Sequence, residues 1–266
     1  MVIRRPEVVK RIELLTNYLH LEYSTSYAIN LDSIVEDEGI IVHYDDYENA
    51  FDGMFLIDSG KHHIHLNIAR GNYKKSGRGR FSLAHELGHY LIDEHHADIR
   101  TGKLKPHPSF LKNTQIDVYE NEADYFAANI LMPKDKFYNA CGGRSFNWNL
   151  IEDLSNKFET SRFATLIRFI NVIQHEVFII GSENSIIKWF IISDDFPRMK
   201  HKFKRGEKLP KNALANKHVN GISNIIEDSL SDDWFETWGG KSERDMHEQC
   251  YHAAAYNQII TLLWFP

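Results

Sequence analysis

The sequence predicts an α+β protein in which a small sheet packs against two helices that carry a polar site. Three observations lead to this prediction. Short apolar runs, bounded by glycine and aspartate, alternate with polar residues between positions 39 and 67. Two longer stretches with helical periodicity follow, at residues 82–95 and 117–133. Each of these stretches combines an apolar face with histidine or acidic side chains spaced by one helical turn.

The composition is that of a folded protein, and it does not indicate nucleic acid or a membrane as a partner. With 266 residues, of which 42% are hydrophobic, the chain has enough core material for one large or two modest domains. Its net charge of −6 argues against bulk attraction to nucleic acid. Cys141 and Cys250 lack C-x-x-C spacing, which suits a reducing compartment. We find no signal peptide and no 18-residue apolar run, so we expect a soluble, cytoplasmic protein with no membrane contact.

The N-terminal part is predicted to begin with helices and continue with strands. Pro6 suits the first turn of a helix, and Gly39 is placed to end a second one. A basic, glycine-rich loop and a long polar loop are expected on either side of the first site helix. The predicted elements are helices at 6–20 and 25–37, strands at 39–44, 53–57 and 62–67, a loop at 71–80, a helix at 82–95, a loop at 97–116 and a helix from about 117.

The C-terminal part changes character after Cys141. Residues 149–158 and 161–173 are predicted to form a helix–turn–helix-like pair, with Ser161 as the N-cap of the second helix. Strands are expected beyond it, at 176–180, 186–192 and 259–265. We therefore predict three parts: a first domain at 1–145, a helical segment at 146–174, and a small α+β recognition domain at 175–266.

The most informative motif lies in residues 81–90, FSLAHELGHY. It contains an H-E-x-x-H pattern formed by His85, Glu86 and His89. On a helix the two histidines are i and i+4, so both imidazoles project from one face and can hold a zinc ion. Glu86 can take a proton from a metal-bound water. Because the chain has 15 histidines, the pattern alone is also compatible with chance, or with two core histidines.

A catalytic zinc ion usually has three protein ligands, and two places in the sequence offer the third. His95 follows His89 by six residues, but the position halfway between them is Ile92 rather than a glycine that would let the chain turn back. A helix that continues through Ile92 would carry His95 away from the face of the two motif histidines. We therefore do not favour His95.

The second helix offers a better third ligand. Glu120 and Asp124 are i and i+4, so they lie on one face, as the ligand and supporting carboxylates of a gluzincin-type site do. We predict Glu120 as the third ligand, and Asp124 as the acceptor of a hydrogen bond from a ligand histidine. Glu122 points elsewhere on this helix and is not favoured as a ligand. An isolated Glu120 would be interpreted as an exposed helix carboxylate, so the prediction depends on both motifs together.

Three further histidines occur in the strand at 62–67. His62 alternates with His63 and His65, so these side chains point to opposite faces of a sheet. Side chains on alternate faces cannot converge on one ion. We therefore interpret all three as exposed strand residues rather than as a metal site.

The two motifs together resemble the ImmA/IrrE family of metallopeptidases. Residues 80–89, RFSLAHELGH, match the first family pattern, and residues 120–133, ENEADYFAANILMP, match the second. The resemblance covers about residues 38–135 and implies a zincin-like core. It also implies that His85, His89 and Glu120 are zinc ligands and that Glu86 is the general base.

The same resemblance implies a function and a domain arrangement. It suggests hydrolysis of a peptide bond in a protein substrate, such as a transcriptional repressor in a stress or mobile-element response. Longer members carry a helix-turn-helix-like segment and a GAF-like sensory domain. Here Glu159 replaces the usual turn glycine, and the second helix has few basic residues, so we expect scaffold packing rather than DNA binding. Two other hypotheses remain: a regulator that acts by binding, with a structural zinc, and a toxin of a toxin–antitoxin pair.

Overall fold

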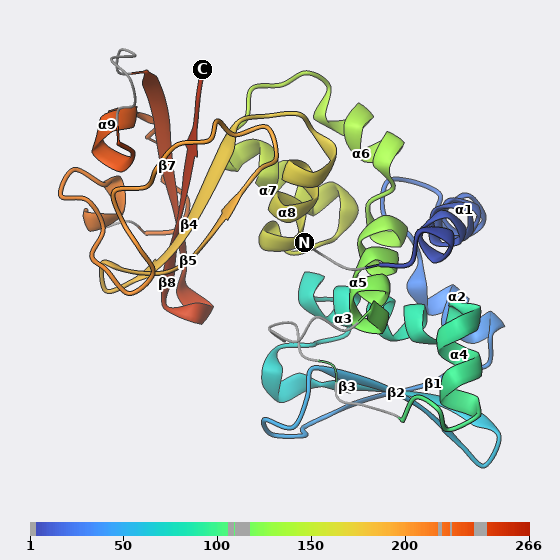
Figure 1. Cartoon of the computed structure of the whole chain (residues 1–266). Helices are drawn as coiled ribbons and strands as arrows, with labels where there is room; N and C mark the ends of the chain where they lie inside the picture. Colours follow the sequence, from blue (N-terminus) through green and yellow to red (C-terminus); the bar gives the residue numbers. More distant parts are fainter. Residues whose placement is uncertain (1–3, 106–108, 110–117, 218–219, 224, 237–243) are drawn as a thin grey trace. The chain divides into compact units, whose positions relative to one another are not determined.

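The structure is a computed structural model, and it divides into two compact units (Figure 1). The first unit comprises Met1–Gly142 and Asp153–Arg168, and the second comprises Gly143–Glu152 and Phe169–Pro266. Helices and two separate sheets make an α+β fold, as the sequence predicts. No helix of the described part is both long and apolar enough to cross a membrane. The structure describes residues 4–105, 109, 118–217, 220–223, 225–236 and 244–266.

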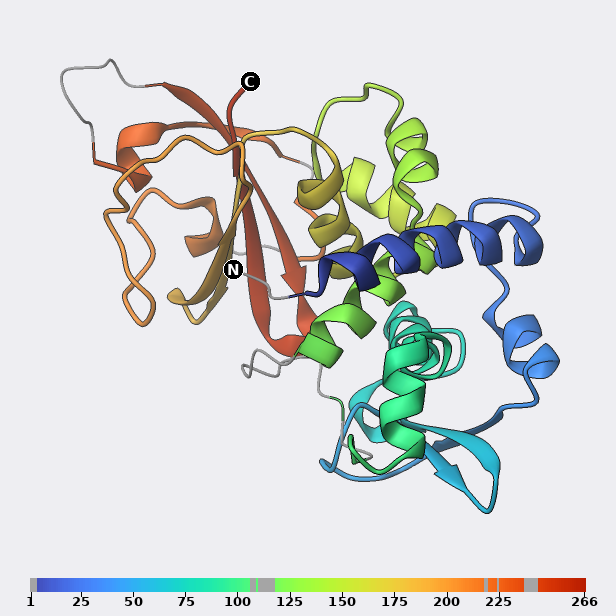
Figure 2. The ribbon, with the colours of Figure 1, turned by 45° about the vertical axis from the view of Figure 1, so that its right-hand side comes forward.

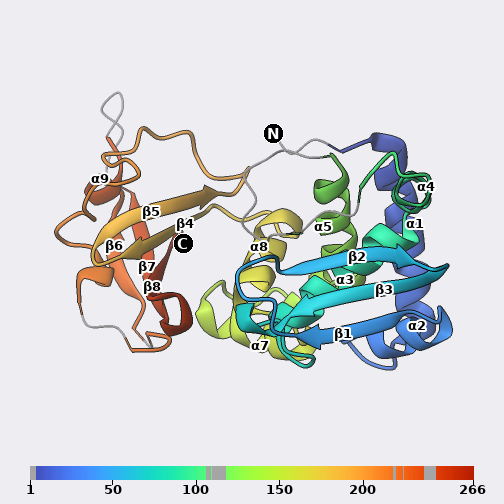
Figure 3. The same ribbon diagram turned by 90° about the horizontal axis from the view of Figure 1, so that it is seen from below.

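A three-stranded sheet forms one layer of the first unit (Figure 3). β3 is central and pairs in parallel with β1 and antiparallel with β2. Ile64 and Leu66 of β3 are fully buried on the face that packs against the helices. The predicted strands are confirmed with small shifts at their ends, as β1 (Ile41–Asp45), β2 (Gly53–Asp58) and β3 (Lys61–Asn67).

Three helices of the first unit stack on this sheet in successive layers. α3 packs directly on the sheet, α5 packs on α3, and α1 packs along α5 (Figures 1 and 2). This order places α3 at the centre of the unit, between the sheet and α5. The helices within Met1–Gly142 are α1 (Pro6–Tyr23), α2 (Leu31–Asp37), α3 (Gly77–Leu91), α4 (Asp93–Arg100), α5 (Val118–Leu131) and α6 (Lys134–Cys141).

Two helix starts differ from the prediction. α2 begins at Leu31 rather than at residue 25, because the side chain of Asn30 accepts a hydrogen bond from the Ser33 amide and caps the helix there. α3 begins inside the segment predicted as a basic loop. The Ser76 hydroxyl accepts a hydrogen bond from the Gly79 amide at 2.9 Å, so the helix starts directly after Ser76.

The long helix predicted over residues 82–95 is two helices. α3 ends at Leu91, and Ile92 has extended backbone angles, with φ −82° and ψ 111°. α4 then begins and continues to Arg100, where the prediction had a loop. The remainder of that predicted loop falls largely on residues 106–108 and 110–117, which lie outside the described residues.

α3 and α5 approach each other closely at Gly88. A Cβ atom at this position would lie 3.1 Å from Cδ1 of Phe126 and 3.3 Å from Cα of Ala123. Phe126 and Ala123 are themselves fully buried. The glycine of the H-E-x-x-H motif therefore lets α5 lie against α3, and this contact brings the acidic residues of α5 beside the motif histidines.

The second unit contains a five-stranded sheet in the order β5-β4-β8-β7-β6, with antiparallel neighbours. β4, β5 and β8 confirm the predicted strands, whereas β6 and β7 are additional. Phe178, Trp234 and Phe235 are fully buried in its core. The elements are β4 (Val177–Glu183), β5 (Ile186–Ile192), β6 (Glu227–Leu230), α9 (Ser231–Trp234), β7 (Asp245–Ala253) and β8 (Gln258–Trp264).

The predicted helical pair is present as α7 (Trp148–Phe158) and α8 (Arg162–Val172). Ser161 caps α8, since its hydroxyl accepts a hydrogen bond from the Ala164 amide at 3.1 Å. Glu159 in the turn has a φ of 52°, in the left-handed region that glycine favours. Residues of both helices are divided between the two units. A DNA contact of this pair and a GAF-like nature of the second unit stay predictions.

Glu248 of β7 is a buried carboxyl group in the second unit. Its side chain is almost fully buried, and its Oε1 accepts a hydrogen bond from the Leu214 amide at 2.8 Å. Burial raises the pKa of Glu248 to about 7. A carboxyl group whose pKa is raised by folding favours the folded state only while it is protonated. Its contribution to stability therefore falls as the pH rises from about 4.5 through about 7.

The Glu248→Gln substitution tests this, because glutamine can still accept the hydrogen bond from Leu214 and carries no charge. At pH 8 we expect the variant to have a free energy of unfolding roughly 3 kcal/mol higher than the wild type. At pH 5 the difference should shrink to less than about 1 kcal/mol. Denaturant unfolding curves of both proteins at the two pH values measure it. An equal difference in the free energy of unfolding at both pH values would contradict the raised pKa of Glu248.

Candidate metal centre

His85 and His89 lie one helical turn apart on α3, and both side chains are buried. Their Nε2 atoms are 3.2 Å apart, and the ring planes are inclined by 68°. Because positions i and i+4 share one face of a helix, the two imidazoles present nitrogen atoms to the same point. Leu83, Ala84 and Leu87 around them are buried and apolar. Polar groups in such surroundings need partners of their own.

α5 brings Glu120 to the same point. Its Oε1 lies 3.1 Å from His89 Nε2, and its Oε2 lies 3.4 Å from His85 Nε2. Zinc bonds of about 2.0–2.1 Å in a tetrahedron require ligand atoms about 3.3–3.4 Å apart. The three separations are close to this value, with a different oxygen of Glu120 facing each ring; both histidines are buried, and the Glu120 side chain is 12% exposed. Two imidazoles and one carboxylate therefore fit a divalent transition-metal ion.

Asp124 supports His85 from the other side of the ring. Its Oδ1 lies 2.9 Å from His85 Nδ1. A neutral imidazole carries one N–H group, and when Nδ1 donates it to Asp124, Nε2 presents a lone pair toward Glu120 and His89. Asp124 can thus fix both the orientation and the tautomer that metal binding requires.

His89 has an outer partner that the sequence did not reveal. His95 Nδ1 lies 3.2 Å from His89 Nδ1, and His95 Nε2 lies 3.0 Å from Glu122 Oε2. Glu122 in turn accepts hydrogen bonds from Arg5, at 2.7 Å from the main-chain amide and 2.6 Å from Nη2. If His89 Nδ1 donates to His95, then His95 carries its proton on Nε2 and donates to Glu122. This arrangement leaves the lone pair of His89 on Nε2.

The location of His95 corrects one step of the sequence argument. We expected a continuous helix to carry His95 away from the motif histidines, but α3 ends at Leu91 and α4 returns the chain to His89. His95 nevertheless contacts the Nδ1 side of the His89 ring, whereas Glu120 contacts the Nε2 side. The sequence feature that could have indicated the position of His95 is Glu122, an acidic residue next to the apolar stripe of α5.

The two carboxylates beside His85 determine its charge state. Burial alone would lower the pKa of His85, but hydrogen bonds to Asp124 and Glu120 raise this pKa well above its usual value. Burial lowers the pKa of His89 to about 3 and that of His95 to about 4, against the effect of the nearby glutamates. Without an ion, His85 is therefore protonated at neutral pH and His89 is neutral, and a metal ion that binds here displaces the Nε2 proton of His85.

Glu86 lies beside this cluster and is buried. It faces the start of β2, where a Cβ atom at position 53 would lie 2.5 Å from its Oε1 and 3.0 Å from its Cγ. The carboxylate thus occupies the space that any side chain at position 53 would need. Gly53 allows the edge strand to pass close to Glu86, and this close approach is the physical reason for glycine here.

A comparison with protein-family models shows the family to which the chain belongs. A family model described as "IrrE N-terminal-like domain" (peptidase M78) matches residues 35–169, which include α3 and α5. The chain belongs to the ImmA/IrrE peptidase family. The sequence-based resemblance is therefore confirmed over about half of the chain, and the helices with the candidate metal ligands lie inside the matched region.

The wider fold of this ImmA/IrrE member is also found in a solved structure, described as a Mycobacterium tuberculosis transcriptional regulator. The TM-score is 0.57 at 12% sequence identity, and the match covers 98% of this chain and 88% of that chain. At this identity the likeness establishes a shared fold only. A search of curated proteins gives no match to the chain.

Proposed function

We propose that the chain is a zinc-dependent endopeptidase in which His85, His89 and Glu120 hold the ion and Glu86 is the general base. The observation that supports this most is the convergence of three side chains: the two Nε2 atoms are 3.2 Å apart, and one oxygen of Glu120 lies 3.1 Å from His89 Nε2 while the other lies 3.4 Å from His85 Nε2. The family membership supports a peptidase, and the donor set suits zinc, which favours nitrogen and oxygen ligands in such sites.

The protein's own groups have distinct tasks in this reaction. A bound zinc ion supplies Lewis-acid polarisation of the scissile carbonyl and lowers the pKa of water. Glu86 accepts the proton of the attacking water and delivers it to the leaving amine nitrogen. Asp124 and the His95–Glu122 pair hold the ring orientations of His85 and His89, so the lone pairs stay directed to one point.

The proposed substrate is a regulatory protein in the cytoplasm, such as a transcriptional repressor. The family resemblance supports this choice. A peptide library prepared from a proteome digest provides a test without a known substrate. We expect new peptide termini, identified by mass spectrometry, with the zinc-loaded protein. No new termini should appear after a chelator has removed the metal. Equal cleavage in both samples would contradict metal dependence.

A substitution at Gly53 tests the location of the proposed base. In Gly53→Ala the new Cβ atom would meet Oε1 of Glu86 at 2.5 Å, so the carboxylate must move. A shift of about 1 Å in a catalytic group can cost about 100-fold in rate. We expect cleavage to fall by about that factor while the zinc content is unchanged, measured with the same library and by elemental analysis. Unchanged cleavage would show that Glu86 tolerates displacement and is not the base.

A further inference from the structure

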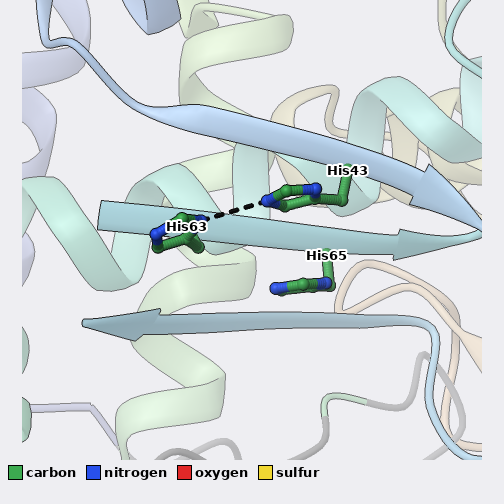
Figure 4. Close-up of side chains that lie close together, drawn as sticks. All are labelled: His43, His63 and His65. Atoms are coloured by element: carbon green, nitrogen blue, oxygen red, sulfur yellow. Dashed lines mark hydrogen bonds between the residues drawn. The ribbon is translucent and has the colours of Figure 1, made fainter. Parts of the chain in front are cut away.

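A second histidine cluster lies on the face of the three-stranded sheet that points away from α3. It consists of His43 from β1 and of His63 and His65 from β3, all half-buried (Figure 4). His43 Nε2 lies 3.0 Å from His63 Nδ1. The rings of His43 and His65 are stacked, with centroids 4.5 Å apart and planes inclined by 13°. One nitrogen from each of the three rings lies within 4.8 Å of the others.

The topology of the sheet explains why these histidines meet. We expected the histidines at 62–65 to point to alternate faces, and this holds for His62, whose ring lies 4.9 Å from Tyr90 of α3. His63 and His65 are two residues apart and share the other face. The parallel register then places His43 directly beside His65. Our expectation that no metal site forms here considered only the strand at 62–67, and it did not include His43 of the neighbouring strand β1.

One nitrogen pair of the cluster has a separation close to that of ligand atoms, and the third ring has an outer hydrogen-bond partner. In the bond between His43 and His63 one nitrogen must offer a lone pair, and the 3.0 Å separation is near the ~3.3 Å of ligand atoms around zinc. Tyr47 provides the outer contact of the third ring, with its hydroxyl oxygen 2.7 Å from His65 Nδ1. If that Nδ1 carries the proton and donates it to Tyr47, His65 Nε2 keeps its lone pair.

Three residues directly opposite the histidines of β3 on this face are apolar. In the strand registers Met54 lies opposite His65, and Leu56 and Ile41 lie opposite His63. Directly opposite residues of paired strands share one face, so these side chains flank the imidazoles. Apolar side chains beside a bound ion restrict the access of water on that side.

We propose that His43, His63 and His65 form a second metal site, which binds a divalent transition-metal ion such as Zn²⁺. Imidazole nitrogen is a preferred ligand for zinc, copper and nickel, and three imidazoles leave one coordination position for water or another group. An ion at this site links β1 to β3 and stabilises the sheet by binding to the folded state. The site is separate from His85, His89 and Glu120, and it does not depend on the proposed peptidase function.

Zinc stoichiometry of the full-length chain tests this proposal. Metal-free protein is dialysed to equilibrium against buffered Zn²⁺, and bound zinc is measured by elemental analysis. We expect two equivalents for the wild type and one for His65→Ala. His62→Ala is the matched control, since it removes a histidine of the same strand on the opposite face, and it should still bind two. Equal binding by the wild type and His65→Ala would overturn the proposal.

The His85→Ala variant separates this proposal from the proposed function. If both sites exist, His85→Ala binds one equivalent, and the double variant with His65→Ala binds none. If only the second site exists, His85→Ala binds as much zinc as the wild type, while His65→Ala still binds one equivalent less. If only the first site exists, only His85→Ala reduces the amount bound, and the second site is rejected.

Tyr47→Phe tests the same site without removing a ligand. The variant keeps all three imidazoles but loses the hydroxyl group at His65 Nδ1. Loss of such an outer contact typically weakens metal affinity about 10- to 100-fold. We expect the wild-type number of zinc ions and a weakening of this size for one of them in a competition titration with a chelating dye. Unchanged affinity for both ions would contradict the role of Tyr47 and the ligand set that it supports.

Discussion

The Glu86→Gln variant is expected to bind zinc at the wild-type level and to lose cleavage by about 1,000-fold or more. Glutamine has nearly the same shape as glutamate, so the buried position next to His85 remains filled. Its amide cannot accept the proton of the attacking water, and general base catalysis is lost. The measurement compares new peptide termini and zinc content for the two proteins at equal concentration.

The control for this variant is Glu36→Gln, which makes the same chemical change at an exposed position of α2. It should cleave as the wild type does. If Glu86→Gln retains full activity with full zinc content, another group is the base and the proposed mechanism is wrong. If Glu86→Gln loses zinc as well, the carboxylate is part of the metal site and its role needs to be reassigned.

Removal of a ligand should have an even larger effect, because it removes the ion and the chemistry together. His85→Ala and Glu120→Ala each leave two of three ligands, and we expect each variant to bind one equivalent of zinc less than the wild type and to give no detectable cleavage. Elemental analysis after dialysis measures the first effect, and the peptide library measures the second. His62→Ala provides a control for loss of a histidine elsewhere in the same unit.

Two outcomes would contradict this prediction. Undiminished zinc in both ligand variants would show that the ion does not bind at His85 and Glu120. Cleavage by the metal-free wild type would show that the reaction does not use the ion. A variant that loses zinc but also unfolds would be replaced by Glu120→Gln, which keeps the size of the side chain in its largely buried position.

The part of the site that depends on local spacing could be predicted from the sequence. His85 and His89 share a helix face because they are four residues apart, and the same argument applies to Glu120 and Asp124. The convergence of the two pairs was predicted by analogy with gluzincin-type sites, and the family resemblance supported it. The structural reason for it is the close packing of α3 and α5 at Gly88, which no local pattern reveals.

The outer contacts of His89 could not be predicted, because they depend on a helix break without a local signal. Ile92 is neither glycine nor proline, and yet the chain is extended there. Only this break brings His95 to His89 and lets it reach Glu122. The ion pair of Glu122 with Arg5 joins residues 117 positions apart, a separation that sequence periodicity cannot address.

In the second unit, strand β7 could not be predicted from the sequence because it buries polar residues. β7 contains Glu248 and Gln249, both buried, where an apolar run would normally indicate a core strand. Their hydrogen bonds are to distant groups, from the Leu214 amide to Glu248 and from the Trp148 amide to Gln249. Tertiary partners therefore stabilise a strand that hydrophobic patterning alone does not predict.

The most direct test of the central claim is the location of the ion itself. Crystals of the zinc-loaded protein, measured on both sides of the zinc absorption edge, give an anomalous difference map that is specific for zinc. We predict a peak about 2.0–2.2 Å from Nε2 of His85, Nε2 of His89 and the carboxylate of Glu120. Absence of a peak between these three side chains, in crystals that contain stoichiometric zinc, would contradict the account.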